Sequence, residues 1–246
     1  MMKKESLQLN SVIFTDFDGV LFDSVKEAYI LSRYAYDGID FKVDIDENEY
    51  AIFREFRYLI THSWHFYYIF KLIKKEISFD VFENEYLKIL PKKISNNARE
   101  FDLRYVDGRK KLVKEDFDFW DSLDKPFLFF EKLIQFQKKT DRKIVVLTNK
   151  KRQPVEDKLK KYKADNFELF ANEDLVNYKT KAEFIQKYIQ KNNFNQAFLI
   201  EDSIDNINAC KGYSAIKSIL VDWGYVSPKN KGIAIEEVLN ILQEVL

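Results

Sequence analysis

Two carboxylates follow a short apolar run near the beginning of the chain. The run 12–15 leads directly into Asp16-Phe17-Asp18-Gly19. Beyond the end of a strand in an open parallel sheet, two such side chains can serve one pocket, where carboxylates act as nucleophiles or as general acids and bases. An ordinary turn explains Asp18-Gly19. It does not explain Asp16, an acidic residue placed directly at the end of the apolar run. The pattern therefore indicates a functional site.

Three further groups of polar residues occupy comparable positions. Thr148 and Asn149 follow the apolar run 144–147. Lys181 lies at the start of a helical pattern, with Lys179 as the alternative. The run 197–200 ends in acidic residues and continues into polar ones, namely Glu201, Asp202, Asp205 and Asn206. Each group alone is common, and the information lies in their order and in their positions at strand ends and a helix start.

Taken together, these motifs resemble those of the haloacid dehalogenase-like (HAD-like) hydrolase superfamily. The first motif of that family is an apolar strand followed by Asp-x-Asp-Gly-Thr/Val, and the chain has Asp16-Phe17-Asp18-Gly19-Val20. The resemblance covers roughly residues 11–24 and 125–225. It implies a Mg²⁺-dependent phosphatase that forms an aspartyl-phosphate on Asp16.

The resemblance also implies a role for each matching residue. Asp18 would protonate the leaving oxygen and then act as the base for hydrolysis. The phosphoryl oxygens would be held by Thr148, Asn149 and Lys181, and Mg²⁺ would be bound by the Asp16 side chain, the Asp18 backbone carbonyl and Asp202. Many members carry an acid where this chain has Asn206, so the roles of Glu201, Asp205 and Asn206 stay open.

The chemistry requires a scaffold, and the sequence predicts a parallel sheet. Short apolar runs alternate with amphipathic stretches, which is typical of βαβ units in an α/β, Rossmann-like core. Strands are expected at 12–15, 144–147, 167–170, 197–200 and 216–221, and helices at 127–139, 154–162, 182–191 and 233–246.

The stretch after the first motif interrupts this rhythm. It contains aromatic-rich helical patterns at 49–60, 64–75 and 79–90, whereas 103–113 has no clear period. We expect an inserted α-helical cap domain at residues 24–124 and a core domain made of residues 1–23 and 125–246. In position and type the insertion looks like the first-type (C1) cap of the family.

Such a cap would read the leaving group of the substrate. The candidate residues are Arg33, Arg54, Arg57, His62, His65, Arg104 and Arg109. His62 and His65 have the i, i+3 spacing of a helix, but no acidic residue or cysteine follows them at a sequence spacing typical of metal sites. This favours hydrogen-bonding or surface roles over a metal site. The aromatic residues at 64–70 are expected to form the core of the cap.

The composition narrows the class of protein. Forty basic residues balance forty acidic ones in 246 residues, which argues against a nucleic-acid partner. No apolar run approaches the roughly 20 residues that span a bilayer, and no signal peptide is visible. Cys210 is the only cysteine. We expect a cytoplasmic protein without a membrane partner, a monomer or homodimer, that binds a small phosphomonoester.

Several activities fit this pattern, and hydrolysis of a small polar phosphorylated metabolite, such as a sugar phosphate, is the leading one. A phosphomutase needs the same core residues, and a non-catalytic binding protein could retain the fold. A dehalogenase is disfavoured because Asp18 is needed only where a leaving oxygen must be protonated. A phosphonate hydrolase would need a Schiff-base lysine in the cap, and nothing specific supports Lys26 or Lys42.

Overall fold

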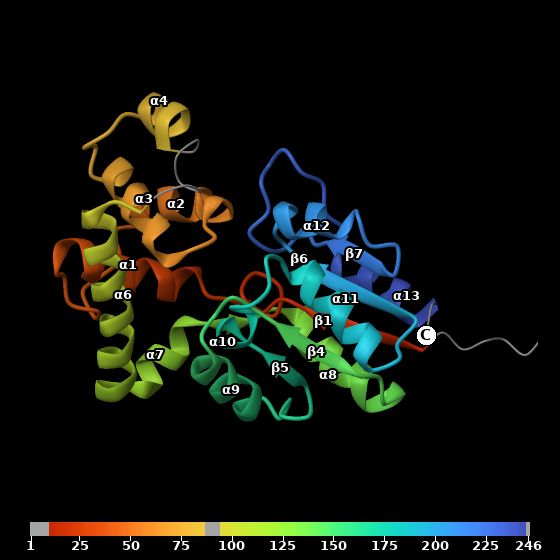
Figure 1. The fold of residues 1–246 in the computed structure, drawn as a ribbon. Helices are drawn as coiled ribbons and strands as arrows, with labels where there is room; N and C mark the ends of the chain where they lie inside the picture. The colour runs from red at the N-terminus through yellow and green to blue at the C-terminus, as the bar shows by residue number, and fades with distance from the viewer. Residues whose placement is uncertain (1–9, 87–93, 245–246) are drawn as a thin grey trace, which may run out of the picture. The chain divides into compact units, whose positions relative to one another are not determined.

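The computed structural model describes residues 10–86 and 94–244 (Figure 1). The chain forms two compact units, one made of Met1–Asp23 and Pro126–Leu246 and the other of Ser24–Lys125. We call them the core unit and the cap unit. Two short paired strands, β2 (Phe22–Asp23) and β3 (Lys125–Pro126), lie where the chain leaves the core unit and returns to it.

The core unit contains a five-stranded parallel sheet, as the sequence predicts. The strands are β1 (Ser11–Thr15), β4 (Ile144–Leu147), β5 (Glu168–Phe170), β6 (Gln196–Glu201) and β7 (Ile216–Leu220). They are ordered β5-β4-β1-β6-β7. Thr15 aligns with Val146 on one side and Ile200 on the other. The carboxyl end of β1 therefore lies between those of β4 and β6.

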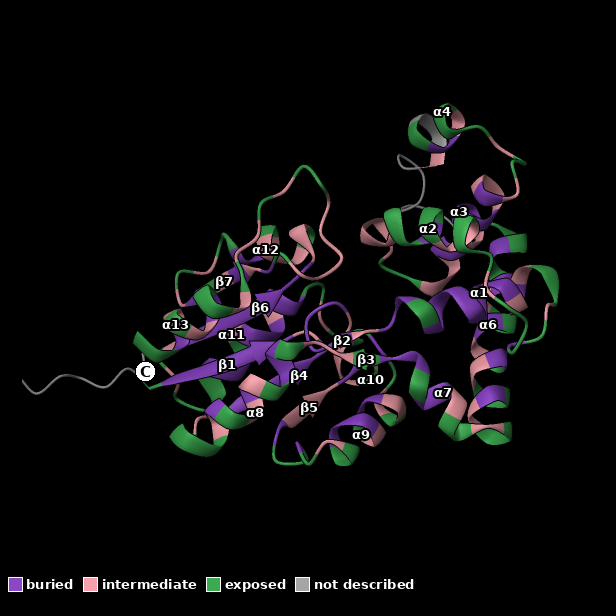
Figure 2. Cartoon of the chain, turned by 180° about the vertical axis from the view of Figure 1, so that it is seen from behind, coloured by how far each residue is buried: buried purple, intermediate pink, exposed green. Residues whose placement is uncertain are grey.

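Both faces of the sheet are buried along its central strands β4, β1 and β6, which read as nearly continuous apolar runs (Figure 2). Alternate residues enter two separate clusters. Ile13 packs in one cluster with α8 (Leu128–Thr140), α9 (Arg152–Lys161) and α13 (Ile235–Glu244). Val12 and Phe14 pack in the other with α11 (Lys181–Lys191) and α12 (Ile204–Cys210). The short helix α10 (Asn172–Leu175) follows β5.

The order of the strands reverses at β1. From there β4 and β5 extend the sheet in one direction, and β6 and β7 extend it in the other. In open α/β sheets, ligands bind beyond the carboxyl ends of the strands at such a reversal. The topology therefore points to the segments that follow β1 and β6.

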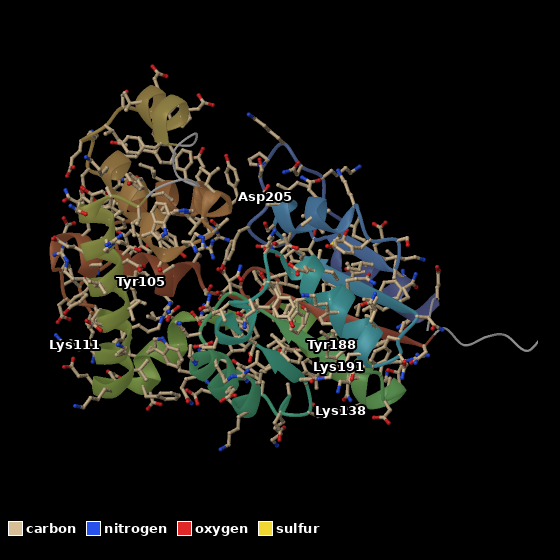
Figure 3. All side chains as sticks on the ribbon, in the orientation of Figure 1. Tyr105, Lys111, Lys138, Tyr188, Lys191 and Asp205 are labelled. Atoms are coloured by element: carbon tan, nitrogen blue, oxygen red, sulfur yellow. The ribbon has the colours of Figure 1, made fainter. Side chains whose placement is uncertain are left out.

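The cap unit is helical. Its helices are α1 (Val25–Asp37), α2 (Glu47–Glu55), α3 (Phe66–Ile73), α4 (Phe79–Val81), α6 (Asn96–Glu115) and α7 (Phe117–Leu123), with 3₁₀ turns at Arg57–Leu59 and Ser63–His65 and a π-helical turn at Phe82–Tyr86. Aromatic rings fill its interior. The Phe53 ring stacks on Phe66 at 4.9 Å and contacts Tyr29 at 5.4 Å. Tyr105 of α6, which is labelled in Figure 3, also stacks on Phe66. The helical expectation for 79–90 falls partly outside the described residues.

Helix α6 includes the stretch 103–113, in which the sequence shows no clear period. Its buried positions are Ala98, Phe101, Tyr105, Gly108 and Leu112, which have helical spacing but include two very small residues. A Cβ atom on Gly108 would lie 2.7 Å from the ring of Tyr34 in α1. Close packing of the two helices thus replaces the large apolar side chains that a sequence pattern detects.

Two of the candidate substrate readers are structural residues of the cap unit. Arg33 is buried and donates hydrogen bonds to the backbone carbonyls of Val43 and Asp44. Arg109 donates two hydrogen bonds to the buried Glu27, at 2.8 and 3.1 Å. Both guanidinium groups thus hold cap segments together. Their role as readers of the leaving group stays a prediction. Arg54, His62 and Arg104 are exposed.

Within the described ranges, no helix is long and apolar enough to cross a membrane.

Candidate active site

Asp16 extends the central strand by one residue. Its backbone N–H donates to the Ile200 carbonyl at 3.0 Å, which continues the pairing of β1 with β6. Side chains alternate along a strand, so Asp16 points to the same face as Val12 and Phe14, the face that α11 covers. The Phe17 N–H donates to Asp16 Oδ1 at 2.7 Å and fixes the orientation of the carboxylate.

Lys181 reaches Asp16 from that helix. It is the first residue of α11, whose N-terminus is capped by Thr180 through a 3.1 Å bond from the Glu183 N–H. The ammonium Nζ lies 2.9 Å from Asp16 Oδ2 and 2.9 Å from Glu201 Oε2. Burial alone would lower the pKa of Lys181, but the two carboxylates outweigh it and raise the pKa. Lys179, the alternative, is exposed.

Three carboxylates gather where β1 and β6 end. Asp16, Glu201 and Asp202 each offer an oxygen, and these oxygens all lie within 4.8 Å of one another. The Tyr225 N–H donates to Asp202 Oδ2 at 2.8 Å, and the Ser203 N–H donates to Glu201 Oε1 at 3.2 Å. With the Phe17 N–H on Asp16, backbone groups therefore orient all three carboxylates.

The Asp16 carboxyl has a strongly perturbed pKa. Burial, and next the negative charge of Glu201, raise the pKa of Asp16 to about 7, and Lys181 offsets only part of this rise. The cluster thus carries more negative charge than its lysine balances. A hard divalent cation with oxygen ligands, such as Mg²⁺, fits this donor set, because it would neutralise the excess charge.

Glycine is required beside this cluster. Gly19 has a φ of +81°, and a Cβ atom there would lie 1.8 Å from Asp202 Oδ2. A Cβ on Gly224 would lie 2.3 Å from the Gly19 carbonyl oxygen. The segments after β1 and β7 therefore approach each other too closely for any side chain.

The second motif forms the next part of the site. Thr148 is buried, and its N–H donates to the Phe170 carbonyl at 3.0 Å. Its hydroxyl Oγ1 accepts the Lys150 N–H at 3.1 Å. Lys150 Nζ in turn lies 3.0 Å from Asp18 Oδ1, which connects the segment after β4 to the segment after β1. Asn149 is exposed.

Comparison with known proteins bears on the fold alone, through similarity to solved structures. No protein-family model matches the sequence, and no curated protein matches it either. Among solved structures, a haloacid dehalogenase-like family hydrolase from Streptococcus pneumoniae has a TM-score of 0.59 at 17% identity, covering 96% of this chain and 99% of that one. This chain has the HAD-like fold.

Two further solved structures extend the comparison. A protein described as a predicted phosphoglycolate phosphatase from Haemophilus somnus has a TM-score of 0.65 at 15% identity, covering 97% of this chain and 100% of that one. A candidate beta-phosphoglucomutase from Thermotoga maritima has a TM-score of 0.54 at 17% identity, covering 96% and 100%. Identities this low establish the fold and leave the activity to the site.

The HAD-like fold places the remaining motif residues unequally. Asp205 lies on α12 and is exposed (Figure 3), outside the carboxylate group that includes Glu201. Asn206 is partly buried, and its backbone carbonyl accepts a 3.3 Å contact from Cys210 Sγ. Of the residues whose roles the sequence left open, Glu201 is therefore the one that lies with Asp16 and Asp202.

Two contributors to the site were missed by sequence reasoning. Lys150 directly follows Thr148-Asn149, and that adjacency was an available signal for it. The Tyr225 N–H is a backbone group in a loop after β7, so no side-chain pattern identifies it. The neighbouring Gly224 was the only sequence feature that could have indicated this backbone donor.

Proposed function

We propose that this chain is a Mg²⁺-dependent phosphomonoesterase that acts on a small polar phosphorylated metabolite through an aspartyl-phosphate on Asp16. One observation carries the proposal: Asp16 lies at the end of the central strand, 2.9 Å from the Lys181 ammonium and within the group that includes Glu201 and Asp202. A carboxylate nucleophile needs such compensation, because a phosphate dianion repels anions.

Each step is assigned to a residue of the core unit. An Asp16 carboxylate oxygen attacks phosphorus while the bond to the leaving oxygen breaks. Asp18 gives that oxygen a proton, then accepts one from the water that hydrolyses the intermediate. Lys181 and Thr148 hold the phosphoryl oxygens, and Lys181 offsets charge that develops in the transition state. Asn149 would contribute an amide or backbone contact to the same group.

Asp16, the Asp18 carbonyl and Asp202 would hold the metal, with Glu201 beside them. When bound, Mg²⁺ supplies charge neutralisation for the phosphoryl group and for the nucleophilic carboxylate. Glu201 also accepts a hydrogen bond from Lys181, so it contributes by fixing the lysine whether or not it touches the ion.

The test is phosphate release, with Mg²⁺ and with EDTA, from a panel of sugar, amino-alcohol, nucleotide and polyol phosphates. We expect metal-dependent release that Asp16→Asn abolishes. Asp165→Asn, at an exposed position before β5, is the matched control and should keep the native rate. Release that persists in Asp16→Asn would contradict the proposal.

A phosphomutase is the second candidate, favoured by the likeness to the candidate beta-phosphoglucomutase. It would use the same core residues but return the phosphoryl group to the rotated intermediate. Isomerisation of a sugar phosphate in the presence of its bisphosphate, followed by ³¹P NMR, separates the two. Isomerisation without phosphate release would favour the mutase. A folded protein that does neither would be a binding protein.

A further inference from the structure

Lys150 is a buried lysine to which the proposed reaction assigns no role. Its side chain is only 4% exposed, and its Nζ lies 3.0 Å from Asp18 Oδ1. It also lies 5.5 Å from the centre of the Phe17 ring. Lysine is almost never buried without a partner, and here one partner is the residue assigned to protonate the leaving oxygen.

The backbone of Lys150 is held on both sides. Its N–H donates to Thr148 Oγ1 at 3.1 Å, and its carbonyl accepts the Asn172 N–H at 3.0 Å. The origin of the side chain is therefore fixed relative to β4 and to the segment after β5. A lysine stem that starts from a fixed backbone and ends in a buried ion pair has lost most of its rotamer freedom.

Asp18 needs an external constraint of this kind. It follows the end of β1, and its side chain is 22% exposed, so the strand itself does not fix its rotamer. An ammonium group 3.0 Å from Oδ1 restricts the orientation of the Asp18 carboxyl. A general acid is effective only when it is held within hydrogen-bond reach of the oxygen that it protonates.

We propose that Lys150 is a positioning residue that orients the Asp18 carboxyl toward the leaving oxygen; this rests on the proposed phosphatase function. In the step concerned, the bond from Asp16 to phosphorus forms and the bond to the leaving oxygen breaks. The Asp18 proton moves to that oxygen. Lys150 keeps its protons and pairs with the carboxylate that remains.

The proposal predicts a dependence on the leaving group. A leaving oxygen that is stable as an anion, such as p-nitrophenolate, departs with little help from an acid, whereas an alkoxide needs the proton. General acids typically contribute about 10²–10⁴-fold. For Lys150→Met we expect kcat/KM to fall about tenfold or more with an alkyl phosphate and less than about threefold with p-nitrophenyl phosphate. We use kcat/KM because it reports only the steps up to departure of the leaving group.

A double-mutant cycle separates an action through Asp18 from direct binding of the phosphoryl group. With the alkyl phosphate, Lys150→Met in an Asp18→Asn background should cause no further loss. Lys150→Arg, which keeps a cation beside Asp18, should recover most of the activity. Lys151→Met is the matched control, because that neighbouring lysine is 61% exposed, and it should leave kcat/KM unchanged for both substrates.

Several results would overturn the proposal. Equal losses with both substrates, or additive losses in the double mutant, would show that Lys150 binds the phosphoryl group or only stabilises the fold. The melting temperature of each variant checks the latter. If the native protein releases no phosphate, the proposed function fails, but the positioning claim is still decided by crystal structures of the native protein and Lys150→Met. An unchanged Asp18 side chain in the variant would refute it.

Discussion

The Asp16 carboxyl lies in surroundings that oppose its ionisation. It is enclosed at the end of a buried strand, and the Glu201 carboxylate lies close by. The single ammonium group of Lys181 is shared between the two carboxylates. The pKa of the proposed nucleophile is therefore about 7 in the protein without metal. Below that pH, a cation that binds to the carboxylate must displace a proton from it.

Mg²⁺ affinity should therefore rise with pH. The pKa of Asp16 is raised from 3.8 to about 7 in the folded protein, so below pH 7 the ion competes with a bound proton. We expect the apparent affinity to increase by roughly tenfold between pH 6 and pH 8, with proton release on binding at the lower pH. Isothermal titration calorimetry at pH 6, 7 and 8, in buffers of different ionisation enthalpy, measures both quantities.

The same pKa shift sets the sign of a stability effect without metal. A raised pKa in the folded state adds stability below pH 3.8, and this contribution is lost as the pH rises through about 7. Asp16→Asn, which cannot ionise, should lack this component. For the metal-binding prediction above, equal Mg²⁺ affinity at pH 6 and pH 8 would refute the expected dependence on pH.

The sequence predicts the residues of the site better than it predicts their partners. Asp16 and Asp202 are identifiable because each follows an apolar run that ends in an acid, and Lys181 because it begins a helix. Lys150 is not, because a lysine after a strand is usually exposed and only the three-dimensional fold brings Asp18 to it. The Tyr225 N–H, a backbone donor, has no side-chain signature at all.

At the level of elements, strands buried on both faces were the easiest to predict. Every residue of β1 and β4 is buried, so periodicity and composition agree there. The expected strand 167–170 shortens to β5, which lies at the edge of the sheet and is only partly buried. Helix α6 was not identified as an element within the expected helical insertion, because Ala98 and Gly108 occupy buried positions where a pattern requires large apolar residues.

Polar contacts between cap helices also hold α6, whose buried positions include the small residues Ala98 and Gly108. Glu27 of α1 is 1% exposed and accepts hydrogen bonds from Arg109 of α6 and from the Trp120 indole of α7, the latter at 2.7 Å. One carboxylate thus joins three helices. A buried charge of this kind is stable only while its partners remain.

Glu27→Ala should therefore destabilise the cap unit strongly. The substitution removes this carboxylate from the Arg109 guanidinium and from the Trp120 indole N–H. We expect this to lower the free energy of unfolding by about 3–5 kcal/mol. Urea denaturation followed by tryptophan fluorescence measures it. Glu100→Ala, at an exposed position of α6, should change stability by less than about 0.5 kcal/mol. Similar values for the two variants would show that the buried contact contributes nothing.

At the level of the whole molecule, the chain is divided by function as well as by contacts. The core unit is discontinuous in sequence and contains the proposed catalytic residues, whereas the cap unit is one continuous segment with its own aromatic interior. The cap unit is inserted into the sequence of the core unit between Asp23 and Pro126. Ligands and mutations that act on one unit should thus have their direct effects there.

Hydrogen exchange tests this division. Mg²⁺ binds only the folded core unit in our proposal, so it should suppress the local openings that expose the carboxylates. We expect slower exchange in peptides that cover residues 12–20, 197–203 and 222–226, and unchanged exchange in α1 and α6. Glu27→Ala should do the reverse, accelerating exchange in α1 and α6 and leaving β1 and β6 unchanged. Asp16→Asn with Mg²⁺ is the control for specific binding. If Mg²⁺ protected α1 and α6 as strongly as the strand ends, the two units would open as one cooperative body, and the cap unit would share in the binding energy of the metal.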